Sequence, residues 1–71
     1  MTGAEFIRKI RKLGRKRGVP VRFTERRGKG SHGTLFYGER STIVKHRRAE
    51  IGPGLLATML KDLRLGRDDL D

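Results

Sequence analysis

No cysteine occurs among the 71 residues of this chain, so its fold must be held together without disulfide bonds. A chain of this length buries only about 60% of the surface that it exposes when unfolded, which leaves room for one small hydrophobic core. The lack of cysteine also excludes a thiolate zinc site and a cysteine nucleophile. We therefore expect a single domain, residues 1–71, built around one core.

Two segments have the apolar spacing of amphipathic helices. The first, residues 4–17, reads AEFIRKIRKLGRKR and is followed by Gly18, a residue suited to ending a helix. The second opens at Gly52-Pro53, with proline near its first position. The apolar residues expected to face the core are Phe6, Ile7, Ile10 and Leu13 in the first helix, and Leu55, Leu56, Met59, Leu60 and Leu63 in the second.

Three segments between these helices are typical of strands, namely residues 20–27, 34–38 and 42–46. The adjacent apolar pairs Leu35-Phe36 and Ile43-Val44 leave the inward face of the last two undecided. The expected fold is α+β, in the order α-β-β-β-α, with a three-stranded antiparallel sheet and two helices on one face. Double-stranded-RNA-binding domains share this order, although a fold alone does not assign a function.

Positive charge is concentrated in the first two thirds of the chain. Lysine and arginine number 18 against eight acidic residues, for a net charge of +10. Residues 1–48 hold 15 basic and three acidic side chains, whereas residues 49–71 hold three and five. Since basic side chains gain affinity for polyanions by releasing phosphate counterions, this distribution favours a nucleic-acid partner over a merely solvated surface.

The sequence does not suggest a membrane protein. No apolar run approaches the roughly 20 residues of a transmembrane helix, and the N-terminal residues lack the hydrophobic stretch of a secretory signal. The basic segment 4–17 could lie on a membrane, but its four apolar residues are only enough to face a core. We expect a cytoplasmic protein without a membrane partner.

Residues 28–33, GKGSHG, place a histidine between glycines and among basic residues. The spacing is not that of a phosphate-binding P-loop, and two histidines without cysteine or an acidic cluster make a weak metal site. RNA, however, can be cleaved without a metal when its 2′-hydroxyl attacks the adjacent phosphate. Histidine can take or give a proton at neutral pH, and lysine and arginine can stabilise the charge that builds on phosphorus. The alternative is a turn with an incidental histidine.

The run GKGSHGTLFYG, followed by TIVKHRRAEIGPGLLATMLKDLRL, resembles the HicA toxins, small bacterial mRNA interferases of type II toxin–antitoxin modules. The resemblance extends from EFIRKIRKLG to MLKDL, and its most specific part is the Gly-Ser-His of residues 30–32. It implies a fold like that of double-stranded-RNA-binding domains and a histidine, His32, that is essential for RNA cleavage. It also implies a cognate HicB antitoxin that binds and blocks the toxin.

The expected function is therefore that of a metal-independent endoribonuclease toxin acting on single-stranded mRNA, with no cofactor. His32 is the candidate general base or acid. The second proton-transfer group is left open between a lysine, the tyrosine, His46 and water, and His46 is interpreted as structural or RNA-contacting rather than catalytic. Whichever of Phe36 and Tyr37 faces outward could stack on a base. The candidate RNA-binding residues are Arg26, Arg27, Lys29, Gly30, Ser31 and Lys45.

Two other functions are compatible with the same charge and fold. One is a non-catalytic RNA-binding module and the other is a small ribosome-associated protein. Both would tolerate the loss of His32 with little change in activity, whereas a nuclease would not.

Overall fold

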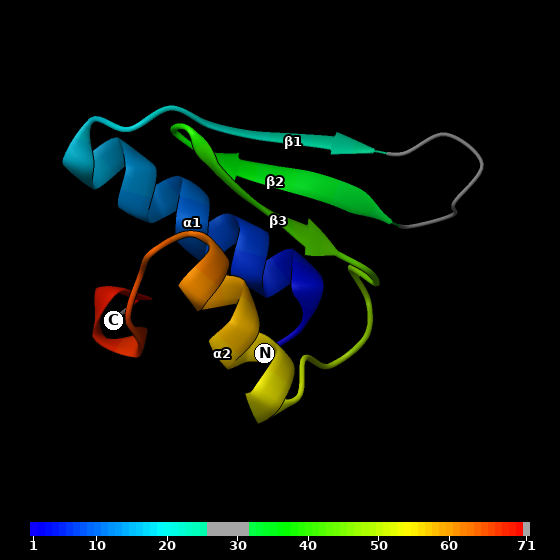
Figure 1. Ribbon diagram of the computed structural model, residues 1–71. Coiled ribbons are helices and arrows are strands. Elements are labelled where there is room, and N and C mark those ends of the chain that lie inside the picture. Colours follow the sequence, from blue (N-terminus) through cyan, green and yellow to red (C-terminus); the bar gives the residue numbers. More distant parts are fainter. Residues whose placement is uncertain (26–31, 71) are drawn as a thin grey trace.

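The computed structural model describes residues 1–25 and 32–70 of the chain. Its elements follow in the order α1 (Gly3–Arg17), β1 (Val21–Glu25), β2 (Gly33–Tyr37), β3 (Arg40–Val44), α2 (Pro53–Asp62) and the short 3₁₀ helix η1 (Arg67–Leu70). The three strands form an antiparallel sheet in the order β1-β2-β3. Both long helices cover the same face of this sheet (Figure 1). The predicted α+β fold in the order α-β-β-β-α is confirmed.

The start and end of α1 follow from the residues at its two termini. The Thr2 hydroxyl accepts a hydrogen bond from the Glu5 backbone N–H, and the Glu5 carboxylate accepts one from the Thr2 N–H. This reciprocal capping box satisfies two N–H groups that a helix start leaves without partners. At the other end Gly18 adopts a left-handed conformation, with φ 70°, which glycine reaches without steric cost.

The register of the sheet decides which side of β2 and β3 faces the helices. Leu35 pairs with Phe23 on one side and with Thr42 on the other, and all three side chains point towards the helices. Leu35 is completely buried, whereas Phe36, its neighbour in the chain, lies on the open face of the sheet. In β3 Val44 faces inward, as Thr42 does, and Ile43 points outward with 41% of its surface exposed.

The turn between β2 and β3 is shorter than the sequence suggested. Only Gly38 and Glu39 separate the paired residues Tyr37 and Arg40, and Gly38 has the positive φ of 61° that two-residue hairpin turns require. The third strand therefore spans residues 40–44, and the expectation of 42–46 is wrong because it assumed a four-residue turn. As a result, Lys45 and His46 lie beyond the end of β3.

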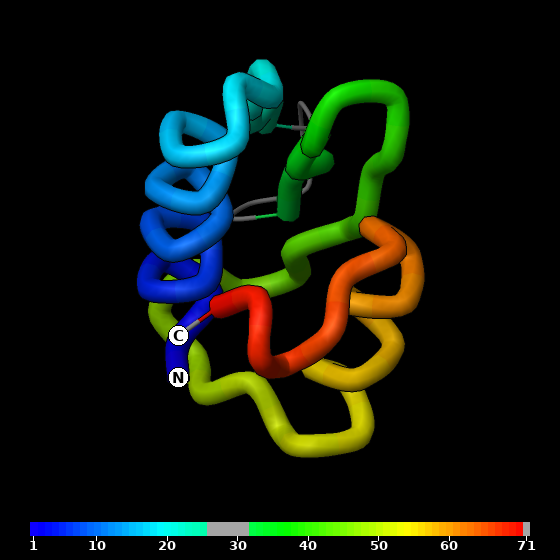
Figure 2. The backbone as a smooth tube through the Cα atoms, turned by 90° about the vertical axis from the view of Figure 1, so that its left-hand side faces the viewer, coloured from blue at the N-terminus to red at the C-terminus, as the bar shows by residue number. Residues whose placement is uncertain are grey.

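The core lies between the sheet and the two helices. Figure 2 shows α1 and α2 side by side, and α1 packs against β1 and β2 while α2 packs against β3. One predicted core residue is wrong: Leu55 has 42% of its surface exposed, because it lies next to Leu56 on α2 and points away from the sheet. The core residues are Phe6, Ile7, Ile10, Leu13, Leu35, Tyr37, Val44, Leu56, Met59, Leu60 and Leu63.

One polar side chain joins the sheet to α2. Thr42 is buried, and its hydroxyl donates a hydrogen bond of 2.8 Å to the carboxylate of Asp62 at the end of α2. A buried hydroxyl that lacked a partner would cost about 1–3 kcal/mol, so this bond removes a penalty as well as fixing the helix. Among residues 1–25 and 32–70, no helix has the length and apolar character needed to cross a membrane.

Candidate functional site

The two histidines of the chain meet at one end of the sheet. Glu25 ends β1, Gly33 begins β2 and Val44 ends β3, and the register pairs these three positions side by side. His32 directly precedes β2 and His46 follows β3. Their ring centroids lie 5.4 Å apart, with the ring planes at 78°, so the edge of one ring meets the face of the other.

The position of His46 is fixed by the segment that contains it. The Ala4 backbone N–H, in the first turn of α1, donates a 2.8 Å hydrogen bond to the Arg47 carbonyl, and the Gly3 N–H donates a 3.3 Å bond to the Ala49 carbonyl. Gly3 allows this close approach, because a Cβ at that position would lie 2.5 Å from the His46 carbonyl oxygen. The N-terminus of α1 thus holds the backbone that directly follows His46.

His32 is placed by a contact between neighbouring strands. Gly33, which follows it, is buried and lies under the ring of Phe23, where any Cβ would overlap the ring carbons. The glycine after the histidine is therefore explained by the close packing of β2 against Phe23 of β1. It does not have a positive φ, unlike the turn residue Gly38.

Arg47 connects the histidine end of the sheet to β1. Its guanidinium forms a 2.6 Å ion pair with Glu25 and lies 5.5 Å from the ring centroid of Phe23. Both charged side chains are partly exposed, so the pair contributes little to stability by itself. Its consequence is geometric, since it ties the segment after β3 to the end of β1.

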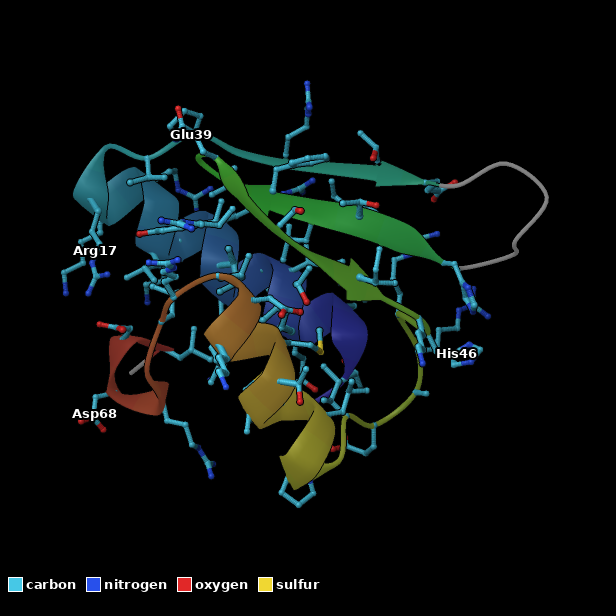
Figure 3. All side chains as sticks on the ribbon, in the orientation of Figure 1. Arg17, Glu39, His46 and Asp68 are labelled. Carbon is cyan, nitrogen blue, oxygen red and sulfur yellow. The ribbon has the colours of Figure 1, made fainter. Side chains whose placement is uncertain are left out.

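A hollow lies beside His46 on the side of α1. It has a volume of about 590 Å³ and is lined by Ala4, His46, Arg47, Arg48 and Ala49. Two arginines and one histidine line it, and none of the described residues around it is acidic. Figure 3 shows the His46 side chain projecting from the end of the molecule opposite Arg17 and Asp68. The hollow can therefore accept an anionic group next to a ring that can exchange a proton.

The predicted site residues fall into three groups. His32 and Lys45 lie at the histidine end of the sheet, and the Lys45 side chain is exposed. Arg26, Arg27, Lys29, Gly30 and Ser31 lie outside the described residues. His46 is exposed, and its contact with His32 could not be predicted because the sequence places the two rings in different segments. The interpretation of His46 as structural or RNA-contacting rather than catalytic stays a prediction.

The structure also shows which of the two aromatic residues of β2 faces outward. Tyr37 points inward, is 9% exposed and sits at the far end of β2 from His32, which excludes it as the second proton-transfer group of this site. Phe36 is the residue on the open face. The guanidinium of Arg22 lies 4.7 Å from its ring centroid, so the ring is already covered in part by a cation.

Shifted pKa values occur at the start of α1 and near η1. Hydrogen bonds from the Thr2 backbone N–H and hydroxyl hold the pKa of Glu5 below its ordinary value. Near η1, the Gly66 backbone N–H and then the Arg17 guanidinium lower the pKa of Asp69, and Asp69 in turn raises the pKa of Arg17. These groups cap a helix and tie α1 to η1, so they serve the fold rather than the candidate site.

Within the described ranges, no group of three or more histidine, aspartate or glutamate side chains could hold a metal ion. No protein-family model matches the chain, and comparisons with curated proteins and with solved structures gave no match. Function must therefore be inferred from the fold and from the two-histidine site at the end of the sheet.

Proposed function

We propose that this chain is an endoribonuclease toxin of the HicA kind, which cleaves single-stranded mRNA without a metal ion and is neutralised by a HicB-type antitoxin. The observation that carries the proposal is the edge-to-face contact of His32 and His46 beside a cationic hollow. Two imidazoles that can exchange protons, next to guanidinium groups that attract phosphate, supply the groups that metal-free RNA cleavage needs.

The reaction uses the 2′-hydroxyl of the RNA as its nucleophile. The 2′-oxygen attacks the adjacent phosphorus and gives up its proton to a base, while the bond from phosphorus to the 5′-oxygen breaks and the leaving oxygen takes a proton from an acid. The products are a 2′,3′-cyclic phosphate and a free 5′-hydroxyl. One group must be unprotonated and the other protonated, so a pair of histidines can provide both.

His32 is the proposed general base or acid, and His46 is the proposed second group. Lys45, which neighbours His46, is the remaining described side chain that could donate a proton there. Arg26, Arg27 and Lys29 are proposed to bind phosphate, as their charge and their proximity to His32 in the sequence suggest. The identity of the antitoxin rests on the sequence resemblance and on the net charge of +10, which favours an acidic partner.

The test is to induce the wild-type chain and the His32→Ala variant side by side, scoring growth and the integrity of cellular RNA. The wild type should arrest growth and fragment mRNA, while the variant should do neither at the same expression level. A Lys61→Gln variant is the control, because Lys61 on α2 does not line the hollow and both imidazoles stay in place. If the chain were a non-catalytic RNA-binding module, the wild type and the His32→Ala variant would affect growth equally, and cellular RNA would stay intact.

A further inference from the structure

The basic residues of α1 occur mainly as pairs in which an arginine is followed by a lysine. Three Arg-Lys pairs occur, at residues 8–9, 11–12 and 15–16. Since successive side chains of an α-helix are about 100° apart, the first member of each pair falls on one flank of the helix and the second on the other. α1 therefore has an arginine flank, formed by Arg8, Arg11 and Arg15, and a lysine flank, formed by Lys9, Lys12 and Lys16.

The two flanks face different surroundings. The arginine flank borders a groove of about 520 Å³ between α1 and β1, whose apolar floor includes Ile7 and Phe23. The lysine flank borders a smaller hollow that also contains Asp69 and Leu70 of η1. A carboxylate thus lies beside the lysines, whereas the described residues that line the arginine groove include no acidic one.

The arginine groove leads to the candidate site. Ala4 and Arg47 line both this groove and the hollow beside His46, so the two depressions adjoin. Arg47 is engaged with Glu25, but Arg11 and Arg15 form no ion pair with any residue in the described ranges. These two guanidinium groups, both on exposed residues, are available to an anion in the groove.

We propose that the groove between α1 and β1 binds the phosphate backbone of the RNA strand whose scissile phosphate lies at the histidines. Arg8 and Arg15 are separated by about 10 Å along the helix axis, while a stacked strand carries a phosphate about every 3.4 Å, so the row spans more than one phosphate. The planar guanidinium binds phosphate through two parallel hydrogen bonds, which lysine cannot do. The choice of RNA as the bound polyanion rests on the proposed function.

Two double variants of equal charge test the groove. Arg11→Gln with Arg15→Gln removes two cations from one flank, and Lys12→Gln with Lys16→Gln removes two from the other, at the same spacing and on exposed residues. The probe is a labelled 2′-O-methyl oligouridylate, which lacks the attacking hydroxyl and is not cleaved. Its affinity is measured by fluorescence anisotropy over a series of salt concentrations, and thermal melting verifies that each variant folds.

The arginine variant should bind the probe more weakly and should flatten the plot of log affinity against log salt by about 1.4, as expected when two phosphate contacts to a single strand are lost. The lysine variant should flatten it by less than half as much. If the double arginine variant does not fold, Arg11→Gln compared with Lys12→Gln decides the question, with a change of about 0.7 in slope expected for the arginine.

The proposal would be wrong if both variants lost the same affinity for the probe, or if the lysine variant lost more. The helix would then attract RNA only by its overall charge. The proposal would also be wrong if the arginine variant bound RNA normally but no longer bound an acidic protein partner. The arginine flank would then be the binding surface for that partner. The probe reports binding alone. A wild type that binds RNA through the arginines but does not cleave it would therefore refute the proposed function without contradicting RNA binding in the groove. A wild type that cleaves RNA, with an arginine variant that binds equally well, would refute only the groove.

Discussion

The rings of His32 and His46 lie edge to face with their centroids 5.4 Å apart, although the two residues belong to different segments at the ends of β2 and β3. The contact brings together the only two side chains of the chain whose ordinary pKa lies near neutrality. A proton can thus be removed at one ring and supplied at the other within the same small region.

Replacing His32 with alanine should abolish RNA cleavage while leaving the fold intact. A positioned acid–base group contributes about 10²–10⁴-fold to a rate, so cleavage should fall by at least that factor. The side chain is outside the hydrophobic core, and stability should change by less than about 1 kcal/mol. Thermal melting, RNA affinity at fixed salt and the cleavage rate are the three measurements. Cleavage at the wild-type rate, or a loss explained by unfolding, would make residues 28–33 a structural turn.

Replacing His46 with alanine should remove one limb of the pH–rate profile. If one histidine acts as base and the other as acid, the wild-type profile is bell-shaped, with one limb reporting each group. The variant should be slower and keep a single limb, because its second proton then comes from water. Lys45→Gln is the matched control next to it, and it should weaken RNA binding without changing the shape of the profile. A bell-shaped profile that persists in His46→Ala would assign the second proton to another group.

RNA cleavage should continue in excess EDTA and leave a 2′,3′-cyclic phosphate or its opened product. The described residues offer no cluster of three metal-ligating side chains, and in the proposed reaction the nucleophile is the 2′-hydroxyl of the RNA. A substrate with deoxyribose at the cleaved position should resist cleavage for the same reason. The products are identified by mass spectrometry and by phosphatase sensitivity of the 3′ end. Activity that is lost on chelation and restored by magnesium would contradict a metal-free reaction.

An acidic antitoxin should inhibit by covering the histidine end of the molecule without unfolding it. A surface of this charge density accelerates encounter with an acidic partner, and blocking His32 and His46 would stop the reaction directly. Hydrogen exchange on the complex should show protection around both histidines and on the exposed side of α1. Protection confined to α2, with His32 left open, would instead favour inhibition from a distance.

Local sequence signals were enough to predict the helices and the order of the strands. Apolar residues recur in α1 at the helical period, and Gly18 ends the helix with the left-handed φ that favours glycine. The prediction of α2 was correct in position but included Leu55, which is exposed. A helix that packs on one edge of a sheet buries only a narrow stripe of side chains. The sequence does not show which apolar residues at the margin of that stripe stay exposed.

The contact between the histidines could not be predicted in the same way. Cross-strand neighbours are set by the length of the turn, and a two-residue turn at Gly38-Glu39 moves every partner of β3 relative to a four-residue one. The sequence gives the residues that favour a turn, but several turn lengths satisfy them. The sequence therefore leaves His46 as one of several candidates for the second proton-transfer group, and only the structure places it against His32.

Gly3 shows how the fold positions His46, and it permits a test that leaves both imidazoles in place. A Cβ at Gly3 would lie 2.5 Å from the His46 carbonyl oxygen and 2.9 Å from the Arg47 Cα. Both atoms belong to the backbone, so neither can move aside as the end of a flexible side chain would. Gly54 is the natural control, because it also lies in a helix and a Cβ there would meet no atom within 4 Å.

Gly3→Ala should therefore lower both stability and activity, whereas Gly54→Ala should lower neither. Overpacking at Gly3 should cost about 1–3 kcal/mol, and the remaining folded protein should cleave more slowly because the segment carrying His46 has shifted. Replacing glycine by alanine in an unhindered helical position should instead stabilise the protein by up to about 1 kcal/mol. Thermal unfolding and cleavage rates measured well below both melting temperatures separate the two effects. A folded Gly3→Ala variant that cleaves RNA at the wild-type rate would show that the contact between α1 and the His46 segment does not position the His46 ring for the proposed reaction.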